Sequence, residues 1–180
     1  MAFTRKLTTP LATAFALTAL LLAGSPGAAY ANETTEVDGR GDATPSLDVT
    51  KVEFRYDAAG ARARIHVTDL QPAGEFVFAV ANRTQSRRYG IVATGLADGS
   101  RTSTFYTFRD GVVAVKQCKG SKVRWSVAKD VVSMSFPERC FRGLSHKVVM
   151  GVGSTRDFPD GTTVDHGPAS VLKAPSGKGR

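Results

Sequence analysis

The densest group of chemically active side chains in this 180-residue sequence is a set of cations around its two cysteines. These cations lie around the cysteine-bearing end of the segment 117–143, and Glu138 is the only acid among them. The seven cations are Lys116, Lys119, Lys122, Arg124, Arg139, Arg142 and Lys147. Because a surface of one sign attracts the opposite sign, this set predicts a site for an envelope phosphopolymer, an acidic polysaccharide or extracellular nucleic acid. The alternative is a solvated face of a chain with 24 Lys and Arg against 16 Asp and Glu.

Specific nucleic-acid recognition is not expected at these cations. Proteins that hold single strands combine cations with exposed aromatic platforms on which bases stack, and no such aromatic residues are interleaved here. The sequence therefore favours binding of an anionic polymer through its charge over specific recognition of a nucleic acid.

A second group of charged residues could bind a cation. The segment 157–165 reads DFPDGTTVD and contains Asp157, Asp160 and Asp165, whose carboxylates are the oxygen ligands that calcium prefers. Their spacing does not match an EF-hand loop, and Pro159-Asp160-Gly161 is also an ordinary turn sequence. We expect no resident metal and no cofactor, and these three residues are the one calcium candidate.

The remaining reactive residues do not form a catalytic motif. His66 falls on the outward face of an alternating run, His146 opens another run, and His166 lies near the end. The adjacent Ser145 and His146 lack the G-x-S-x-G context of a nucleophile. We therefore predict no catalytic residues. A small secreted hydrolase built from scattered side chains and an inhibitor that presents a basic loop remain the alternatives.

The two cysteines flank a predicted hairpin. Alternating apolar residues in the segment 117–143 place Lys122 and Arg124 on the face opposite Trp125. Cys118 and Cys140 fall just past the paired residues, which predicts a disulfide across the open end, whereas a metal site would need further Cys or His ligands nearby. A two-residue turn at Lys129-Asp130 predicts three inward pairs: Val127 with Val132, Trp125 with Met134 and Val123 with Phe136.

Other alternating runs predict an all-β fold. A turn at Ala58-Ala59 pairs the run 52–56 with the run 61–65, which places Val52 opposite Ile65. Asp110-Gly111 is a strong hairpin signal that places Phe108 opposite Val113. The remaining runs are 76–81, 89–94, 102–108 and 146–152. About nine short strands without an amphipathic helix predict an antiparallel β-sandwich with one disulfide, in which 76–81 and 112–115 are core strands.

The ends of the sequence predict an exported protein. Residues 1–31 have a charged start, an apolar run and the cleavage sequence Ala29-Tyr30-Ala31, as in a secretory signal peptide. Residues 32–46 are polar, include the adhesion-like but short match Arg40-Gly41-Asp42, and predict a disordered lead-in. We assign 47–154 to the β-sandwich and 155–180 to a polar, partly disordered C-terminal segment. No membrane span is expected after cleavage, and the predicted location is extracellular.

The order of these motifs resembles a group of small exported β-sandwich proteins from high-GC Gram-positive bacteria that lack an assigned activity. The residues that carry the resemblance, over 47–169, are Cys118 ahead of KVRWSV, then Pro137 and Cys140 followed by Phe141, then KVVMGV, and finally Asp165 with Pro168. The aromatic closing segment of such proteins is missing. The layout is more distantly similar to carbohydrate-binding sandwiches of the DOMON type, by analogy of fold alone.

Composition, motifs and resemblance lead to one functional prediction. We expect a secreted, non-catalytic β-sandwich that acts as a binding or structural module at the cell envelope. Its expected partner is an anionic or glycan polymer. The sequence predicts no particular ligand and no oligomeric state.

Overall fold

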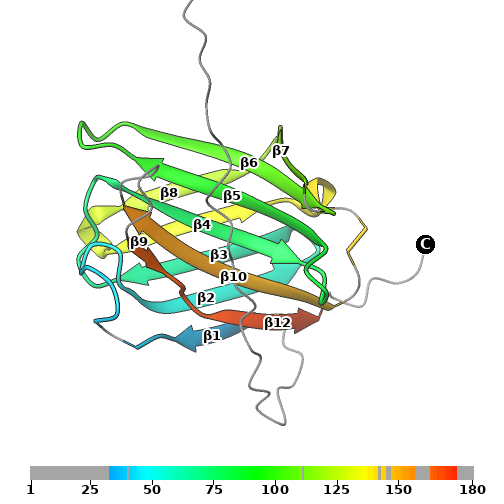
Figure 1. The fold of residues 1–180 in the computed structure, drawn as a ribbon, viewed down its shortest axis with the longest axis horizontal. Helices are drawn as coiled ribbons and strands as arrows, with labels where there is room; N and C mark the ends of the chain where they lie inside the picture. The colour runs from blue at the N-terminus through cyan, green and yellow to red at the C-terminus, as the bar shows by residue number, and fades with distance from the viewer. Residues whose placement is uncertain are drawn as a thin grey trace, which may run out of the picture.

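The computed structural model describes residues 33–39, 41–110, 112–141, 143–144, 147–156 and 163–173. These residues form twelve β-strands and two single-turn 3-10 helices, η1 (Val127–Lys129) and η2 (Glu138–Cys140). The strands build two antiparallel sheets that stack face to face (Figure 1). The predicted all-β sandwich is confirmed, with more strands than the expected nine.

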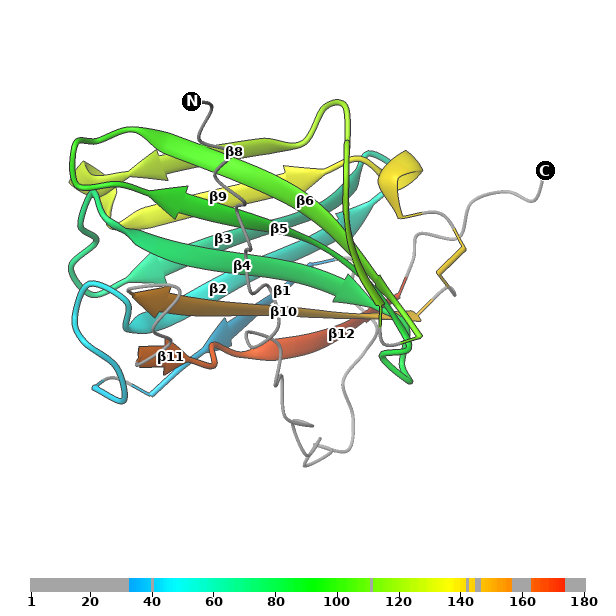
Figure 2. The same cartoon turned by 45° about the horizontal axis from the view of Figure 1, so that its top comes forward.

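One sheet has five strands in the order β1-β2-β3-β9-β8. Figure 2 shows it as the rear layer, with β1 and β8 at its two edges. The bounds of its strands are β1 (Glu33–Val37), β2 (Val49–Asp57), β3 (Gly60–Val67), β9 (Val131–Phe136) and β8 (Lys122–Ser126).

The other sheet has seven strands, in the order β11-β10-β4-β5-β6-β7, with β12 also paired to β10. Strand β10 is long enough for β12 and β11 to pair with different parts of it. The bounds are β4 (Gly74–Ala81), β5 (Arg87–Gly95), β6 (Arg101–Arg109), β7 (Val112–Lys116), β10 (Lys147–Arg156), β11 (Thr163–Asp165) and β12 (Ala169–Lys173).

The core between the sheets is built from the inward-facing residues, which alternate with outward-facing residues along each strand, as in other sandwiches. Phe136 of β9 lies at its aromatic centre, with ring centroids 5.4 Å from Phe78, 5.4 Å from Phe105 and 5.3 Å from Phe141. Trp125 is buried, as expected, and its Nε1 donates a hydrogen bond to Gln71 O at 3.1 Å.

Two predicted hairpin registers are confirmed. Val52 pairs with Ile65 in β2 and β3, and Phe108 pairs with Val113 in β6 and β7. In both hairpins a short turn fixes which residues meet, so local sequence determines the register.

The predicted register of the β8–β9 hairpin is wrong by two residues. Trp125 pairs with Val132 rather than Met134, and Val123 pairs with Met134 rather than Phe136. The connection is the helix η1 followed by Asp130 in a left-handed conformation (φ 51°), not a two-residue turn. This longer loop removes Val127 from the strand. A shift of two residues keeps every side chain on its predicted face.

The prediction that 112–115 is a core strand is also wrong. Strand β7 is the edge of the seven-stranded sheet, and Val112 and Val115 are each 67% exposed. Apolar composition indicated burial, but the opposite sheet does not cover this edge.

The predicted domain limits were too narrow at both ends. Residues 33–37, expected to be disordered, form β1 and pair with β2. Residues 163–165 and 169–173, assigned to the polar C-terminal segment, form β11 and β12 on β10. Strand β12 lies beside β1, so the two ends of the described chain close one side of the sandwich (Figure 1). The proposed signal peptide, 1–31, lies outside the described residues.

Candidate functional site

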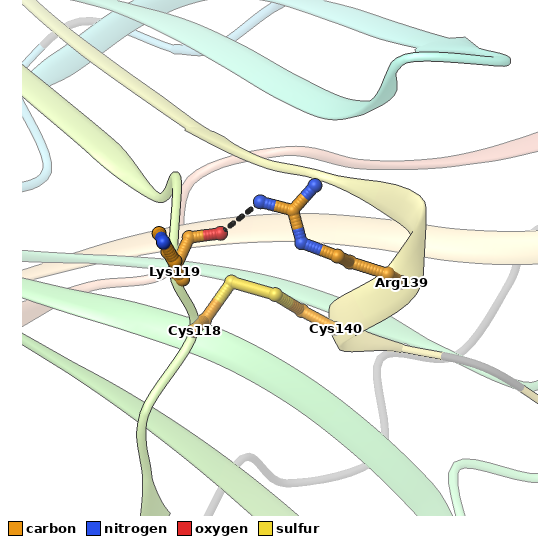
Figure 3. Close-up of a disulfide and its surroundings, with 4 residues drawn as sticks. All are labelled: Cys118, Lys119, Arg139 and Cys140. Atoms are coloured by element: carbon orange, nitrogen blue, oxygen red, sulfur yellow. Dashed lines mark hydrogen bonds between the residues drawn. A yellow bond between two sulfur atoms is a disulfide. The ribbon is translucent and has the colours of Figure 1, made fainter.

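The predicted disulfide joins the two layers of the sandwich. Cys118 and Cys140 are bonded, with an S–S distance of 1.99 Å and a Cα–Cα distance of 5.6 Å. Cys118 follows β7 of the seven-stranded sheet, and Cys140 ends η2, which follows β9 of the five-stranded sheet. Beside the bond, the Arg139 guanidinium donates a hydrogen bond to Lys119 O (Figure 3).

The structure divides the seven cations predicted to form one patch. Lys116 ends β7, whereas Lys147 begins β10, and three strands separate β7 from β10 in the sheet. Lys119 is exposed in the loop after Cys118, and Arg139 lines a hollow of about 460 Å³ against the β2–β3 turn. Arg142 lies outside the described residues. Lys122 and Arg124 are set apart from these on the outer face of β8.

The same outer face of the sheet also carries two arginines of β3. The register across β3, β9 and β8 forms two neighbouring rows, each with a small serine of β9 between one cation from β3 and one from β8. We call this surface the basic face. Its six residues are Arg62, Ser135 and Lys122 in one row and Arg64, Ser133 and Arg124 in the other.

Strand alternation positions the basic face. The inward neighbours Ala63, Val132 and Trp125 are buried in the core, so the intervening residues point to solvent. All four cations are exposed and the two serines are half-buried. With strands about 4.8 Å apart, the cations of one row lie about 10 Å apart at their backbones, and the rows lie about 7 Å apart.

Acidic residues of the neighbouring strand β2 compensate only part of the basic face. Glu53 accepts a hydrogen bond from Lys51 Nζ at 2.8 Å, which lowers the pKa of Glu53, and it lies 3.6 Å from Arg64 Nη1. Within the described ranges, Arg62, Lys122 and Arg124 form no ion pair. Positive charge is therefore less compensated at Lys122 and Arg124 of β8 than at Arg64 of β3.

The side chains of this face are of the types that can contact anions. Arginine presents a planar set of donors that matches carboxylate and phosphate oxygens, and lysine contributes a mobile point charge. The serine hydroxyls between them can donate to the same oxygens. Two rows of this kind suit a polymer with repeated anionic groups better than a single small anion.

Sequence analysis identified half of these cations. Lys122 and Arg124 were predicted to point outward, whereas Arg62 and Arg64 were not assigned to a site. It missed that the two pairs share one surface, because β3 and β9 are paired through contacts between segments far apart in the chain. No local pattern encodes such a pairing.

The calcium candidate is also regrouped. Asp157 and Asp160 lie outside the described residues. Asp165 is buried at the end of β11, where Asp38 and Asp42 lie close to it. Sequence analysis missed these partners because they come from the segment predicted to be disordered.

Burial and neighbouring negative charge both disfavour ionised carboxylates in this acidic group. Burial, together with the charges of Asp42, Asp38 and Asp48, raises the pKa of Asp165 to about 6, although a hydrogen bond from Val49 N opposes the shift. Burial also raises the pKa of Asp38. The folded chain therefore holds carboxylates close together at a cost in free energy.

No protein-family model matches this chain, and no curated protein matches it in sequence. The part of the chain that the structure describes contains no helix long and apolar enough to cross a membrane. The basic face and the acidic group around Asp165 are therefore the two candidate sites of this protein.

Proposed function

We propose that this protein is an exported, non-catalytic β-sandwich module that binds an anionic polymer of the cell envelope on its basic face. The observation that carries the proposal is the register that places four exposed cations around two serines. Residues far apart in the chain meet there, and of the four cations only Arg64 forms an ion pair within the described ranges, which leaves positive charge available to a polyanion.

Export is supported by two independent features. Residues 1–31 have the pattern of a secretory signal peptide. The Cys118–Cys140 disulfide is a bond that persists mainly in oxidising compartments outside the cytosol. The resemblance to small exported β-sandwich proteins agrees with both.

The polymer that fits best carries phosphodiester or uronate groups. Neutral sugars bind mainly by stacking on exposed aromatic rings, and the only Trp, Trp125, is buried in the core. On the seven-stranded sheet, Tyr106 is buried and Phe108 is covered by the Arg88 guanidinium, 4.3 Å from its ring centroid. Charge rather than stacking therefore supports the proposal.

Removing the charge of the basic face should weaken polyanion binding. We expect the fourfold variant Arg62→Gln, Arg64→Gln, Lys122→Gln and Arg124→Gln to bind linear polyphosphate and polygalacturonate at least about tenfold more weakly, since exposed ion pairs contribute up to about 1 kcal/mol each. Isothermal titration calorimetry at low ionic strength measures this loss. Affinity of the unchanged protein should fall steeply with added salt.

A control of equal net charge separates the basic face from general positive charge. The variant Arg83→Gln, Lys116→Gln, Lys119→Gln and Lys173→Gln removes four exposed cations that lie elsewhere. It should bind both polymers within about threefold of the unchanged protein. Equal loss in the two variants would show that net charge alone drives binding and would refute the basic face. Saturable binding to neutral dextran would instead support a glycan module.

A further inference from the structure

Carboxylates from opposite ends of the described chain meet where the edges of the two sheets come together. Asp38 follows β1 directly, Asp42 lies in the connection to β2, and Asp165 is the last residue of β11. One carboxylate oxygen from each lies within 4.8 Å of those from the other two. Strands β1 and β11 are edges of different sheets, so this group joins the two layers.

These separations suit a single calcium ion. Calcium binds oxygen ligands at about 2.3–2.6 Å, so two oxygens on one ion lie at most about 4.6–5.2 Å apart. The three carboxylate oxygens fall within this limit. An ion placed among them could bind all three after at most small side-chain movements.

A second observation points to a ligand at this place. Asp165 is only 2% exposed; its Oδ2 accepts a hydrogen bond from Val49 N at 2.8 Å, whereas its buried Oδ1 has no hydrogen-bond partner in the described structure. The buried Oδ2 of Asp38 likewise has none. Buried polar atoms are almost always satisfied in folded proteins. Two such carboxylate oxygens in one acidic group are a second observation that favours a cation ligand.

A fourth carboxylate positions the group. Asp48 Oδ1 accepts a hydrogen bond from Gly41 N at 3.1 Å, and its Oδ2 accepts one from Thr68 Oγ1 at 2.7 Å. Both oxygens are therefore engaged with the protein. Asp48 fixes the backbone beside Asp42 and adds negative charge, and we assign it a positioning role.

We propose that Asp38, Asp42 and Asp165 bind one calcium ion, which links the end of β1 to the end of β11. The ligands are all carboxylate oxygens, which suit a hard cation, whereas zinc and copper favour nitrogen and sulfur. Calcium accepts irregular sets of protein oxygens more readily than magnesium, which keeps an octahedral shell with several waters. The ion would offset the repulsion among the carboxylates and fasten the polar strand β1 to the sandwich.

The first test is thermal unfolding of the purified protein with calcium chloride, magnesium chloride or EDTA. A ligand at a hundred times its Kd should raise Tm by about 5–10 °C for a chain of this size. We expect this rise with calcium and a clearly smaller one with magnesium, and a calorimetric stoichiometry of one. A Tm that calcium and EDTA leave unchanged would overturn the proposal, and an equal response to magnesium would overturn the choice of calcium.

Variants separate the site from a general salt effect. Asp165→Asn and Asp38→Asn should abolish the rise in Tm with calcium. In EDTA each should be at least as stable as the unchanged protein, because one of several repelling charges is gone. Asp42→Asn, at an exposed residue, serves as a third variant if a buried substitution prevents folding.

Asp98→Asn is the matched control. Asp98 is an exposed turn residue whose Oδ1 accepts a hydrogen bond from Ser100 N at 2.8 Å, a bond that asparagine can keep. This variant should respond to calcium as the unchanged protein does. If the site variants also keep the full response, the ion binds elsewhere and the proposal is wrong. The basic face lies over β3, β9 and β8, so its test is independent of this one.

Discussion

Replacing Gly60 by alanine is expected to lower the free energy of unfolding by about 3–5 kcal/mol. Gly60 begins β3 with φ +131°, a conformation that residues with a side chain rarely adopt. A Cβ there would lie 2.2 Å from Phe136 O and 2.7 Å from Pro137 Cα. Both neighbours are backbone atoms, so β3 and the end of β9 would have to move apart.

Urea unfolding followed by tryptophan fluorescence measures this change, because Trp125 is buried in the core. Gly99→Ala is the matched control: Gly99 also has a positive φ, +83°, but no atom lies within 4 Å of the position of its Cβ. That variant should lose only about 1 kcal/mol. Similar losses in the two variants would show that backbone conformation, and not the contact between β3 and β9, makes Gly60 necessary.

Removing the disulfide should lower the free energy of unfolding by nearly as much. The double variant Cys118→Ala and Cys140→Ala is expected to lose about 3 kcal/mol, since the bond closes a loop with a sequence separation of 22 and restricts the unfolded chain. Without this crosslink, the unfolded chain of the double variant should be more extended than that of the oxidised protein. The dependence of unfolding free energy on urea concentration should therefore steepen.

The reduced, unchanged protein is the control for this prediction. It keeps both cysteine side chains and loses only the crosslink, so it should resemble the double variant within about 1 kcal/mol. The oxidised protein should contain no titratable thiol. Equal stability of the oxidised and reduced proteins would contradict the crosslinking role.

Local sequence predicted the hairpins because their pairing is local. Val52 and Ile65 meet across a short turn, and both the alternation and the turn residues are visible in one segment. The β8–β9 hairpin shows the limit: its apolar faces were predicted correctly, but the helix η1 lengthened the loop and shifted the pairing by two residues. The sequence did not show that Asp130 would adopt a positive φ and end η1.

The strands at the two ends could not be predicted from their own composition. Residues 33–37 read ETTEV and carry no apolar face, so β1 forms only because β2 and β12 lie beside it. In 112–115 the error was opposite, since apolar residues lie on an exposed edge. Both cases show tertiary context overriding the pattern of a short segment.

The same limit applies to both candidate sites. Lys122 and Arg124 were predicted as outward cations, but only the pairing of β3 with β9 brings Arg62 and Arg64 beside them. Asp165 lies 116 positions from its hydrogen-bond partner Val49 in the chain. A single sequence carries no signal for contacts of that length, so Asp38 and Asp42 remained unrecognised.

The most direct test of the proposed function is a nuclear magnetic resonance titration of the isotope-labelled protein with linear polyphosphate. The largest saturable shifts are expected at the amides of Ser133 and Ser135 and at the guanidinium groups of Arg62 and Arg64. Shifts should decline toward β1 and remain small on the seven-stranded sheet. Largest shifts on that second sheet, or no saturable shift at all, would contradict an anionic polymer on the basic face.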